Sequence, residues 1–205
     1  MKLNLVRHIS EKRLAVAFSG GVDSVVLAEY LMSKQYDIVL AHFIHDSPIA
    51  EDELAFTLNY AKDRGLEVEI DIAPGHKNTK QSTEEHWRNA RYEFFKKLEM
   101  PVAMGHHLDD AVEWYLFTAL HGEGRIMEYA HTNVFRPMLL TPKQKIIEIA
   151  EQNGFNWFED PTNSDASFAA RNRVRHRILP EALKINPGLY SVVKKKILAK
   201  LAINN

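Results

Sequence analysis

The sequence has 205 residues, a formal net charge of −1 and no cysteine. Apolar residues make up 45% and charged residues 26%, as in ordinary soluble globular proteins. The lack of cysteine excludes disulfides, thiolate zinc sites and cysteine-ligated iron–sulfur clusters within these residues. No apolar run is long enough to span a membrane and no signal-peptide pattern is visible, so we expect a cytoplasmic protein with no membrane partner.

The first predicted elements are a strand at residues 14–18 and an apolar helix at residues 25–31. The turn between them reads Ser19-Gly20-Gly21-Val22-Asp23-Ser24. Adjacent glycines permit positive φ and leave no Cβ against a ligand, and the helix N-terminus offers N–H groups to an anion. Ser19 and Ser24 add hydroxyl donors, and Asp23 is placed to hold a divalent cation. A plain turn in which Asp23 or Ser24 caps the helix is the alternative, but the pattern favours nucleotide binding.

Three further strand–helix units follow along the chain. The strands are predicted at residues 37–44, 66–72 and 101–106, and the helices at residues 51–64, 83–99 and 109–120. Residues 37–44 form a continuous apolar run, which is typical of a parallel strand buried on both faces. Regular alternation of strand and helix predicts an α/β fold with an open, mostly parallel sheet covered by helices on both faces.

The last third of the chain is predicted to be helical after a long loop. Residues 121–142 contain two glycines and two prolines and are expected to form that loop. The segments after it are a short helix at 143–153, an arginine-rich segment at 171–177, a helix ending near 186–187, and a lysine-rich helix at 188–205. We therefore predict a main domain at 1–140 and a small helical lobe at 141–205. Its basic tail is either a phosphate-backbone contact or a solvated helix face.

A second polar cluster, His106-His107-Leu108-Asp109-Asp110-Ala111-Val112-Glu113, lies where a strand is predicted to end and a helix to begin. Ligands bind at the carboxyl ends of strands in open α/β sheets, so this cluster and the glycine turn should face one site. Capping explains one acid near a helix N-terminus but not three. The remaining carboxylates suit a cationic substrate, and Mg²⁺ held mainly by ATP phosphates is favoured over structural zinc.

The glycine turn resembles the Ser-Gly-Gly-x-Asp-Ser loop of the N-type ATP pyrophosphatases, the PP-loop superfamily, which split ATP between the α and β phosphates. His-His-x-Asp-Asp-x-x-Glu at residues 106–113 resembles a motif of the tRNA(Ile)-lysidine synthetases. Three more segments resemble that family in order: Glu84-x-x-x-Arg88-x-x-Arg91-Tyr92; Arg136-Pro137-Met138-Leu139; and Glu159-Asp160-Pro161-Thr162-Asn163 followed by Arg171-Asn172-Arg173-x-Arg175. The resemblance spans roughly residues 14–187.

This resemblance implies an adenine nucleotide alpha hydrolase-like fold and a ligase that uses ATP and Mg²⁺. In that family ATP adenylates the C2 carbonyl of the wobble cytidine of isoleucine tRNA with a CAU anticodon. The ε-amine of L-lysine then displaces AMP. The implied partners are therefore that tRNA and L-lysine.

The resemblance also implies roles for individual residues. The catalytic candidates are Asp23, Arg88, Asp110, Glu113 and Arg171, with Asp23 on Mg²⁺. ATP is assigned to Ser19, Gly20, Gly21, Val22, Asp23 and Ser24, together with Ala17, His42 and His106. Substrate binding is assigned to Asp110, Glu113, Arg136 and Arg175. Asp110 and Glu113 would hold the lysine amine, and one of them would help remove its proton, because the unperturbed amine pKa is about 10.4.

Three features depart from the family pattern. The family usually has further domains after this core, whereas this sequence stops at residue 205, which predicts a short form. Asp46-Ser47-Pro48 replaces a Gly-x-Arg segment, and Trp114 stands where threonine is common. tRNA selection would then depend on the basic lobe, a partner or a homo-oligomer.

Other functions stay open from the sequence. They are a PP-loop ligase acting on another tRNA or on a small metabolite, and a non-catalytic nucleotide- or RNA-binding remnant. Thiolation is disfavoured because the sequence has no cysteine for sulfur relay.

Overall fold

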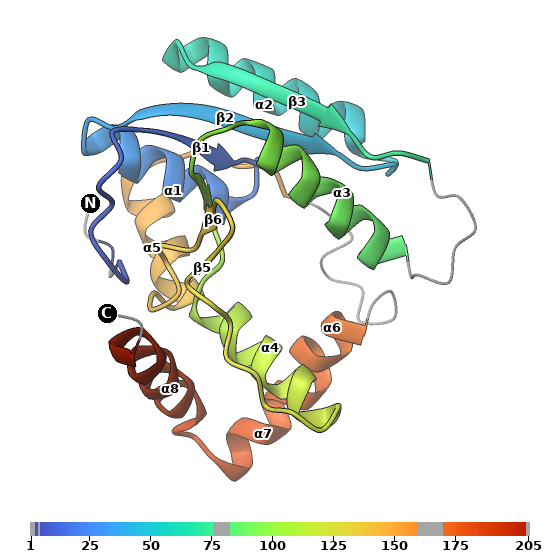
Figure 1. Cartoon of the computed structure of the whole chain (residues 1–205), viewed down its shortest axis with the longest axis vertical. Coiled ribbons are helices and arrows are strands. Elements are labelled where there is room, and N and C mark those ends of the chain that lie inside the picture. The colour runs from blue at the N-terminus through green and yellow to red at the C-terminus, as the bar shows by residue number, and fades with distance from the viewer. Residues whose placement is uncertain (1–2, 4, 76–82, 160–169, 204–205) are drawn as a thin grey trace.

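The computed structural model describes residues 3, 5–75, 83–159 and 170–203 (Figure 1). At its centre is a six-stranded sheet in the order β3-β2-β1-β4-β6-β5. The strands are β1 (Arg13–Ala17), β2 (Asp37–Ile44), β3 (Glu67–Ile72), β4 (Val102–Met104), β5 (Ala130–His131) and β6 (Val134–Phe135). Neighbouring strands pair in parallel except β5 and β6, which are antiparallel. The predicted mostly parallel sheet is confirmed.

Helices cover both faces of this sheet (Figure 1). They are α1 (Val22–Ser33), α2 (Ala50–Arg64), α3 (Thr83–Lys97), α4 (Leu108–Leu120), α5 (Lys143–Asn153), α6 (Ala170–Arg173), the π-helical turn η2 (Val174–Ile178), α7 (Leu179–Ile185) and α8 (Leu189–Ile203). Successive strand side chains point to opposite faces. Accordingly, Leu14 and Val16 of β1 pack with α1, α2 and α5, whereas Ala15 belongs to the cluster that contains Phe94 and Phe95 of α3.

The segment predicted as a loop at residues 121–142 contains β5 and β6, so that prediction is wrong in part. The two strands form a tight hairpin in which Thr132 has a φ of 54°. β6 also pairs with β4 and therefore extends the sheet. Each strand has only two residues, which is too short for alternation in the sequence to reveal it.

A second apolar cluster joins α4 to the C-terminal helices. It contains Leu108 and Val112 of α4 with Leu189, Val193 and Ile197 of α8. α5 lies elsewhere, because its buried residues pack in the main core against α1. A domain boundary near residue 140 stays a prediction. None of the helices that the structure describes is long and apolar enough to cross a membrane.

The strand order places two turns side by side. β1 connects through α1 to β2 on one side and pairs in parallel with β4 on its other side, so the order in which strands are added to the sheet reverses between β1 and β4. Ala17 at the end of β1 is paired with Met104 at the end of β4. The glycine turn and the His106–Glu113 segment therefore leave the sheet next to each other, at the position where open α/β sheets bind ligands.

Candidate active site

The glycine turn connects β1 to α1 and contains one position, Gly20, at which a side chain would be strained. Gly20 has a φ of +76°, and a Cβ there would lie 2.9 Å from Phe56 Cδ1, so this position requires glycine. Gly21 has an ordinary φ of −65° and is the N-cap of α1, without a side-chain cap hydrogen bond. The alternative in which Asp23 or Ser24 caps the helix is therefore wrong. The N-terminus of α1 keeps its capacity to bind an anion.

The Ser24 hydroxyl is used inside this turn. It donates to the Gly21 carbonyl (2.9 Å) and accepts the backbone N–H of Ser19 (3.3 Å). Ser24 is buried, whereas Ser19 is exposed. Ser24 therefore fixes the shape of the turn, and Ser19 is the exposed one of the two serines that the sequence offers to a phosphate.

A cavity of about 230 Å³ opens beside the turn. The predicted site residues that line it are Ala17, Ser19, Asp23, Ser24, His42, His106 and Asp110. They come from the ends of β1, β2 and β4 and from the first turns of α1 and α4. Gly20, Gly21 and Val22 build the adjoining turn and start of α1 instead of lining the cavity. The structure thus brings the two sequence motifs to one cavity.

Asp23 is paired with a lysine that the sequence analysis missed. Lys143 Nζ lies 2.7 Å from each carboxylate oxygen of Asp23, across 120 residues of sequence. His107 Nε2 lies 3.6 Å from the same carboxylate. Within the described residues, no group of three or more histidine or acidic side chains could hold a metal ion by itself. Asp23 therefore fits Mg²⁺ only as a single carboxylate ligand, with the remaining ligands coming from phosphates and water.

Two neutral histidines form another part of the cavity lining. His42 is 2% exposed, and its Nδ1–H donates to the Phe18 carbonyl (2.9 Å), which leaves Nε2 as an acceptor. Burial lowers the pKa of His42; burial, followed by the nearby Arg91 and His42, lowers the pKa of His45 to about 4. His42 Nε2 is buried and has no hydrogen-bond partner among the described residues. Such an orphaned acceptor fits an N–H group of a ligand, for example an adenine amine.

Two of the three acids at the start of α4 have structural partners. Asp110 Oδ2 accepts the backbone N–H of His107 (2.9 Å), and the N–H of Asp110 donates to His107 Nδ1 (3.4 Å), which makes a capping box. Asp109 accepts the hydroxyl of Tyr190 (2.8 Å) and the backbone N–H of Lys143 (2.7 Å). Asp109 therefore ties α5 and α8 to α4, and Asp110 is the acid that caps the helix.

Glu113 makes a two-armed ion pair with Arg175 of η2. Arg175 Nε lies 2.6 Å from Oε1 and Nη2 lies 2.9 Å from Oε2, and Nη2 is also 3.5 Å from Asp110 Oδ1. Burial raises the pKa of Glu113, and the hydrogen bonds and charge of Arg175 oppose that rise. Two carboxylates share one guanidinium here, so a net negative charge remains for a second cation. π-Helical turns such as η2 are frequent at functional sites.

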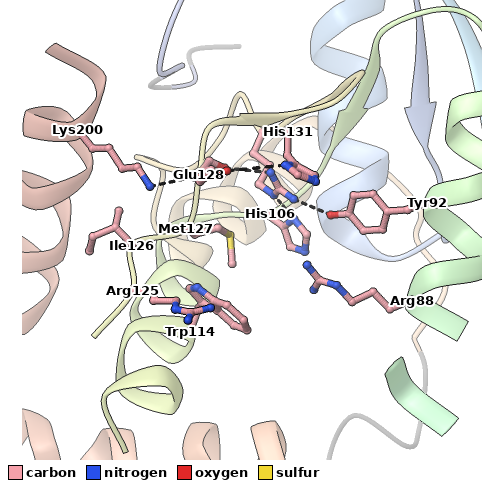
Figure 2. Close-up of a pocket in the computed structure, with 11 residues that line it drawn as sticks. Arg88, Tyr92, His106, Trp114, Arg125, Ile126, Met127, Glu128, His131 and Lys200 are labelled. Atoms are coloured by element: carbon pink, nitrogen blue, oxygen red, sulfur yellow. Dashed lines mark hydrogen bonds and ion pairs between the residues drawn. The ribbon is translucent and has the colours of Figure 1, made fainter. Parts of the chain in front are cut away.

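A larger cavity of about 380 Å³ adjoins the first, and both are lined by His106 (Figure 2). Arg88 and Arg136, two further predicted residues, line the larger cavity. Arg136 is 5% exposed and donates to His106 Nδ1 (3.1 Å), the Tyr92 hydroxyl (2.6 Å) and the Glu128 carbonyl (3.0 Å). Arg136 is therefore a residue that positions His106 and Tyr92.

Glu113 and Arg175 line neither of these cavities. Arg171 lies in α6, but its side chain is outside what the structure describes, as are Asp160 and Asn163. Lys143 was missed because its contact with Asp23 depends on the docking of α5.

Comparison with known proteins identifies the family. The model of the PP-loop domain family matches residues 2–182. A tRNA(Ile)-lysidine synthase from Persephonella marina is 36% identical over 194 residues, which is 86% of this chain and 43% of that protein. The tRNA(Ile)-lysidine synthase of Exiguobacterium sibiricum is 31% identical over 192 residues, 88% of this chain and 46% of that protein. The chain thus spans less than half the length of these two curated relatives.

Solved structures agree on the fold. The U34-tRNA thiolase NcsA from Methanococcus maripaludis with its [4Fe-4S] cluster has a TM-score of 0.70 and 17% identity, covering 98% of this chain and 73% of that one. The NH3-dependent NAD synthetase from Campylobacter jejuni has a TM-score of 0.53 and 14% identity, covering 96% of this chain and 88% of that one. At these identities the likeness concerns the fold alone. Since the family model covers nearly the whole described core, the chain belongs to the PP-loop domain family.

Proposed function

We propose that this chain uses ATP and Mg²⁺ to join L-lysine to C2 of the wobble cytidine of isoleucine tRNA with a CAU anticodon. AMP and pyrophosphate would be the other products. One observation carries the proposal: Asp23, His106 and Asp110 line a single cavity at the ends of β1 and β4, with the buried Glu113 one helical turn beyond Asp110. The relatives named tRNA(Ile)-lysidine synthase, at 36% and 31% identity, support the assignment.

The ATP end of the proposed site is built around α1. The uncapped N-terminus of α1 and the exposed Ser19 would bind phosphate oxygens, and Asp23 would hold Mg²⁺ against them. His42 Nε2 would accept an N–H of the nucleobase. Lys143 would leave Asp23 when Mg²⁺ binds and would then add a positive charge near the phosphates. ATP supplies the leaving group that makes the cytidine carbonyl carbon reactive.

The lysine end of the proposed site is the pair of carboxylates on α4. Free lysine is protonated at neutral pH, because its amine pKa is about 10.4, and a nucleophilic amine must lose that proton. Burial raises the pKa of Glu113, so Glu113 is a stronger base than an ordinary carboxylate. Asp110 is fixed by the capping box and would orient the ammonium while Glu113 receives a proton.

Sulfur transfer is the reaction of a protein with the same fold, the U34-tRNA thiolase that carries a [4Fe-4S] cluster. These 205 residues contain no cysteine and so provide no thiolate ligand for such a cluster. We therefore do not propose thiolation for this chain. The remaining alternative function is that of an amide ligase acting on a small molecule, and the experiment below distinguishes it from the tRNA ligase.

The test is incorporation of radiolabelled lysine into tRNA transcripts with ATP and Mg²⁺, comparing isoleucine (CAU) and methionine tRNA. Glu113→Gln and Asp110→Asn keep the side-chain shape and should lower incorporation by at least about 100-fold, the usual contribution of an acid–base group. Glu51→Gln, an exposed position on α2, is the matched control and should change nothing.

Label on the isoleucine transcript alone supports the proposal in full. Label on both transcripts supports the chemistry but contradicts tRNA selection by this chain alone. If no transcript is labelled and AMP is released with small amines or metabolites, the tRNA proposal is wrong.

A further inference from the structure

The larger cavity, shown in Figure 2, has an unusual combination of charge and aromatic surface. Among the described residues, four cationic side chains line it, against one carboxylate, that of Glu128. Its volume of about 380 Å³ falls in the range of about 300–1,000 Å³ that is typical of small-ligand sites. An excess of positive charge in a concave site favours an anionic ligand.

The cationic side chains of this cavity differ in whether they are paired with a carboxylate. Lys200 is paired with Glu128 (3.0 Å), and Arg125 is paired with Glu123. Arg88 has no carboxylate partner within the described part of the chain, and its guanidinium lies 5.3 Å from the centre of the Tyr92 ring. In Figure 2, Arg88 reaches from α3 toward His106 and the centre of the cavity. Arg88 is therefore the cation best placed for an anion that enters.

Trp114 supplies the aromatic surface on the α4 side of the cavity (Figure 2). It is half-buried and stacks on Phe117 with ring centres 6.2 Å apart and planes 23° apart. This stacking fixes the orientation of the indole. An oriented aromatic ring and an arginine that line the same cavity are a combination that binds nucleotides of single-stranded nucleic acids, through base stacking and phosphate contact.

His106 connects this cavity to the one beside the glycine turn. Because Arg136 Nε–H donates to His106 Nδ1, the ring proton of His106 lies on Nε2. A group bound in the larger cavity would therefore meet a ligand of the glycine turn at this histidine. Two ligands that react with each other need such adjacent sites.

We infer that the larger cavity receives one nucleotide of a single-stranded RNA loop, with its base stacked on Trp114 and a phosphate bound by Arg88. This inference rests on the proposed function, since it names the place where the RNA substrate would meet the nucleotide at the glycine turn. The contributions of Trp114 and Arg88 to RNA affinity can be separated by their dependence on salt. Base stacking tolerates any base and depends weakly on salt concentration, whereas a phosphate contact weakens as salt concentration rises.

The test is binding of a hairpin RNA with the sequence of the isoleucine (CAU) anticodon arm, measured by fluorescence anisotropy without ATP or lysine over a series of KCl concentrations. Trp114→Leu should raise Kd about 10-fold with an unchanged salt slope, whereas Trp114→Phe, which keeps an aromatic face, should retain most of the affinity. Arg88→Gln should weaken binding and reduce the slope of log K against log[salt] by about 0.7. Trp157→Leu and Lys62→Gln, which lie outside the cavity and outside the basic tail, are the matched controls. Thermal melting checks that each variant is folded.

The inference is overturned if the hairpin does not bind at low salt, or if folded Trp114→Leu binds within about twofold of the unmodified chain. Equal losses in Trp114→Leu and Trp114→Phe would also overturn it, because they would indicate packing instead of stacking. An unchanged salt slope in Arg88→Gln would refute the phosphate contact. Binding that depends on Trp114 without lysine incorporation would refute the proposed ligase alone, and lysine incorporation with binding independent of Trp114 would refute this cavity alone.

Discussion

Replacing Arg175 by methionine should destabilise the protein in a pH-dependent way. Glu113 is 7% exposed, and both of its carboxylate oxygens accept hydrogen bonds from Arg175. Arg175→Met keeps a long apolar side chain but removes the charge. Glu113 would then be left as a buried carboxylate that shares its surroundings with the like charge of Asp110.

The magnitude follows from the burial of the pair. Removing one partner of a fully buried ion pair costs about 3–5 kcal/mol. The Arg175 side chain is 38% exposed, so water screens the site in part, and we expect a loss of about 2 kcal/mol at neutral pH. For a chain of 205 residues this loss corresponds to a fall in Tm of about 4–8 °C.

The pH dependence has a definite sign. Burial already raises the pKa of Glu113 in the folded protein, and loss of Arg175 removes the main opposing contribution. Between the unfolded and folded pKa values the folded protein binds more protons, so its stability falls as pH rises through that interval. The deficit of Arg175→Met should therefore be small at about pH 4.3, the ordinary pKa of glutamate, and complete above the folded pKa of Glu113.

Urea denaturation at about pH 4.3 and at a pH above neutrality measures this difference. The double variant Glu113→Gln/Arg175→Met should recover most of the stability, since it buries no unpaired charge. If the proposed function holds, L-lysine should also raise the Tm of Arg175→Met, whereas norleucine, which has the same carbon chain without the ammonium, should not. An equal loss at both pH values, or a double variant no more stable than Arg175→Met, would refute the reasoning.

Two more predictions concern the glycine turn. Gly20→Ala combines a positive φ with a clash against Phe56 and should lower the free energy of unfolding, measured by urea denaturation, by about 2–4 kcal/mol. Gly122→Ala has a positive φ but open space around it, so it should lower the free energy of unfolding by only about 1 kcal/mol. Equal losses would contradict the role of the clash. Lys143→Met should free the Asp23 carboxylate for metal, so Mg²⁺ without nucleotide should raise the Tm of this variant more than that of the unmodified chain. Identical Mg²⁺ responses would show that the two cations do not compete.

The main fold could be predicted because its signals are local. An apolar strand followed by a glycine turn and a helix is visible in the sequence, and repeated alternation predicts a parallel sheet. The β5–β6 hairpin could not be predicted, since strands of two residues carry no periodicity. Its place beside β4 depends on pairing across the sheet.

The acids of α4 show where sequence reasoning about the site was incomplete. Spacing indicated that three carboxylates lie near one helix start and that capping explains only one of them. The structure gives Asp110 the capping role and gives Asp109 partners on α5 and α8. The sequence provides no signal for those partners, because a side-chain contact across 81 residues follows only from how the helices dock.

The same separation in sequence explains the charge balance of the site. Asp23 and Glu113 lie on α1 and α4, the helices that follow β1 and β4, and the cations paired with them, Lys143 and Arg175, lie 120 and 62 residues further along the chain. An uncompensated carboxylate at the buried Glu113, and to a lesser degree at the half-buried Asp23, would oppose folding, so docking of α5 and η2 stabilises both acids. If the proposed function holds, Mg²⁺ would replace Lys143 at Asp23, and an ammonium would compete with Arg175 for Glu113. Affinity for Mg²⁺ or for an ammonium would therefore depend on which new contacts Lys143 and Arg175 make after they are displaced. The helices that carry these two side chains would then contribute to the choice between one cation and another.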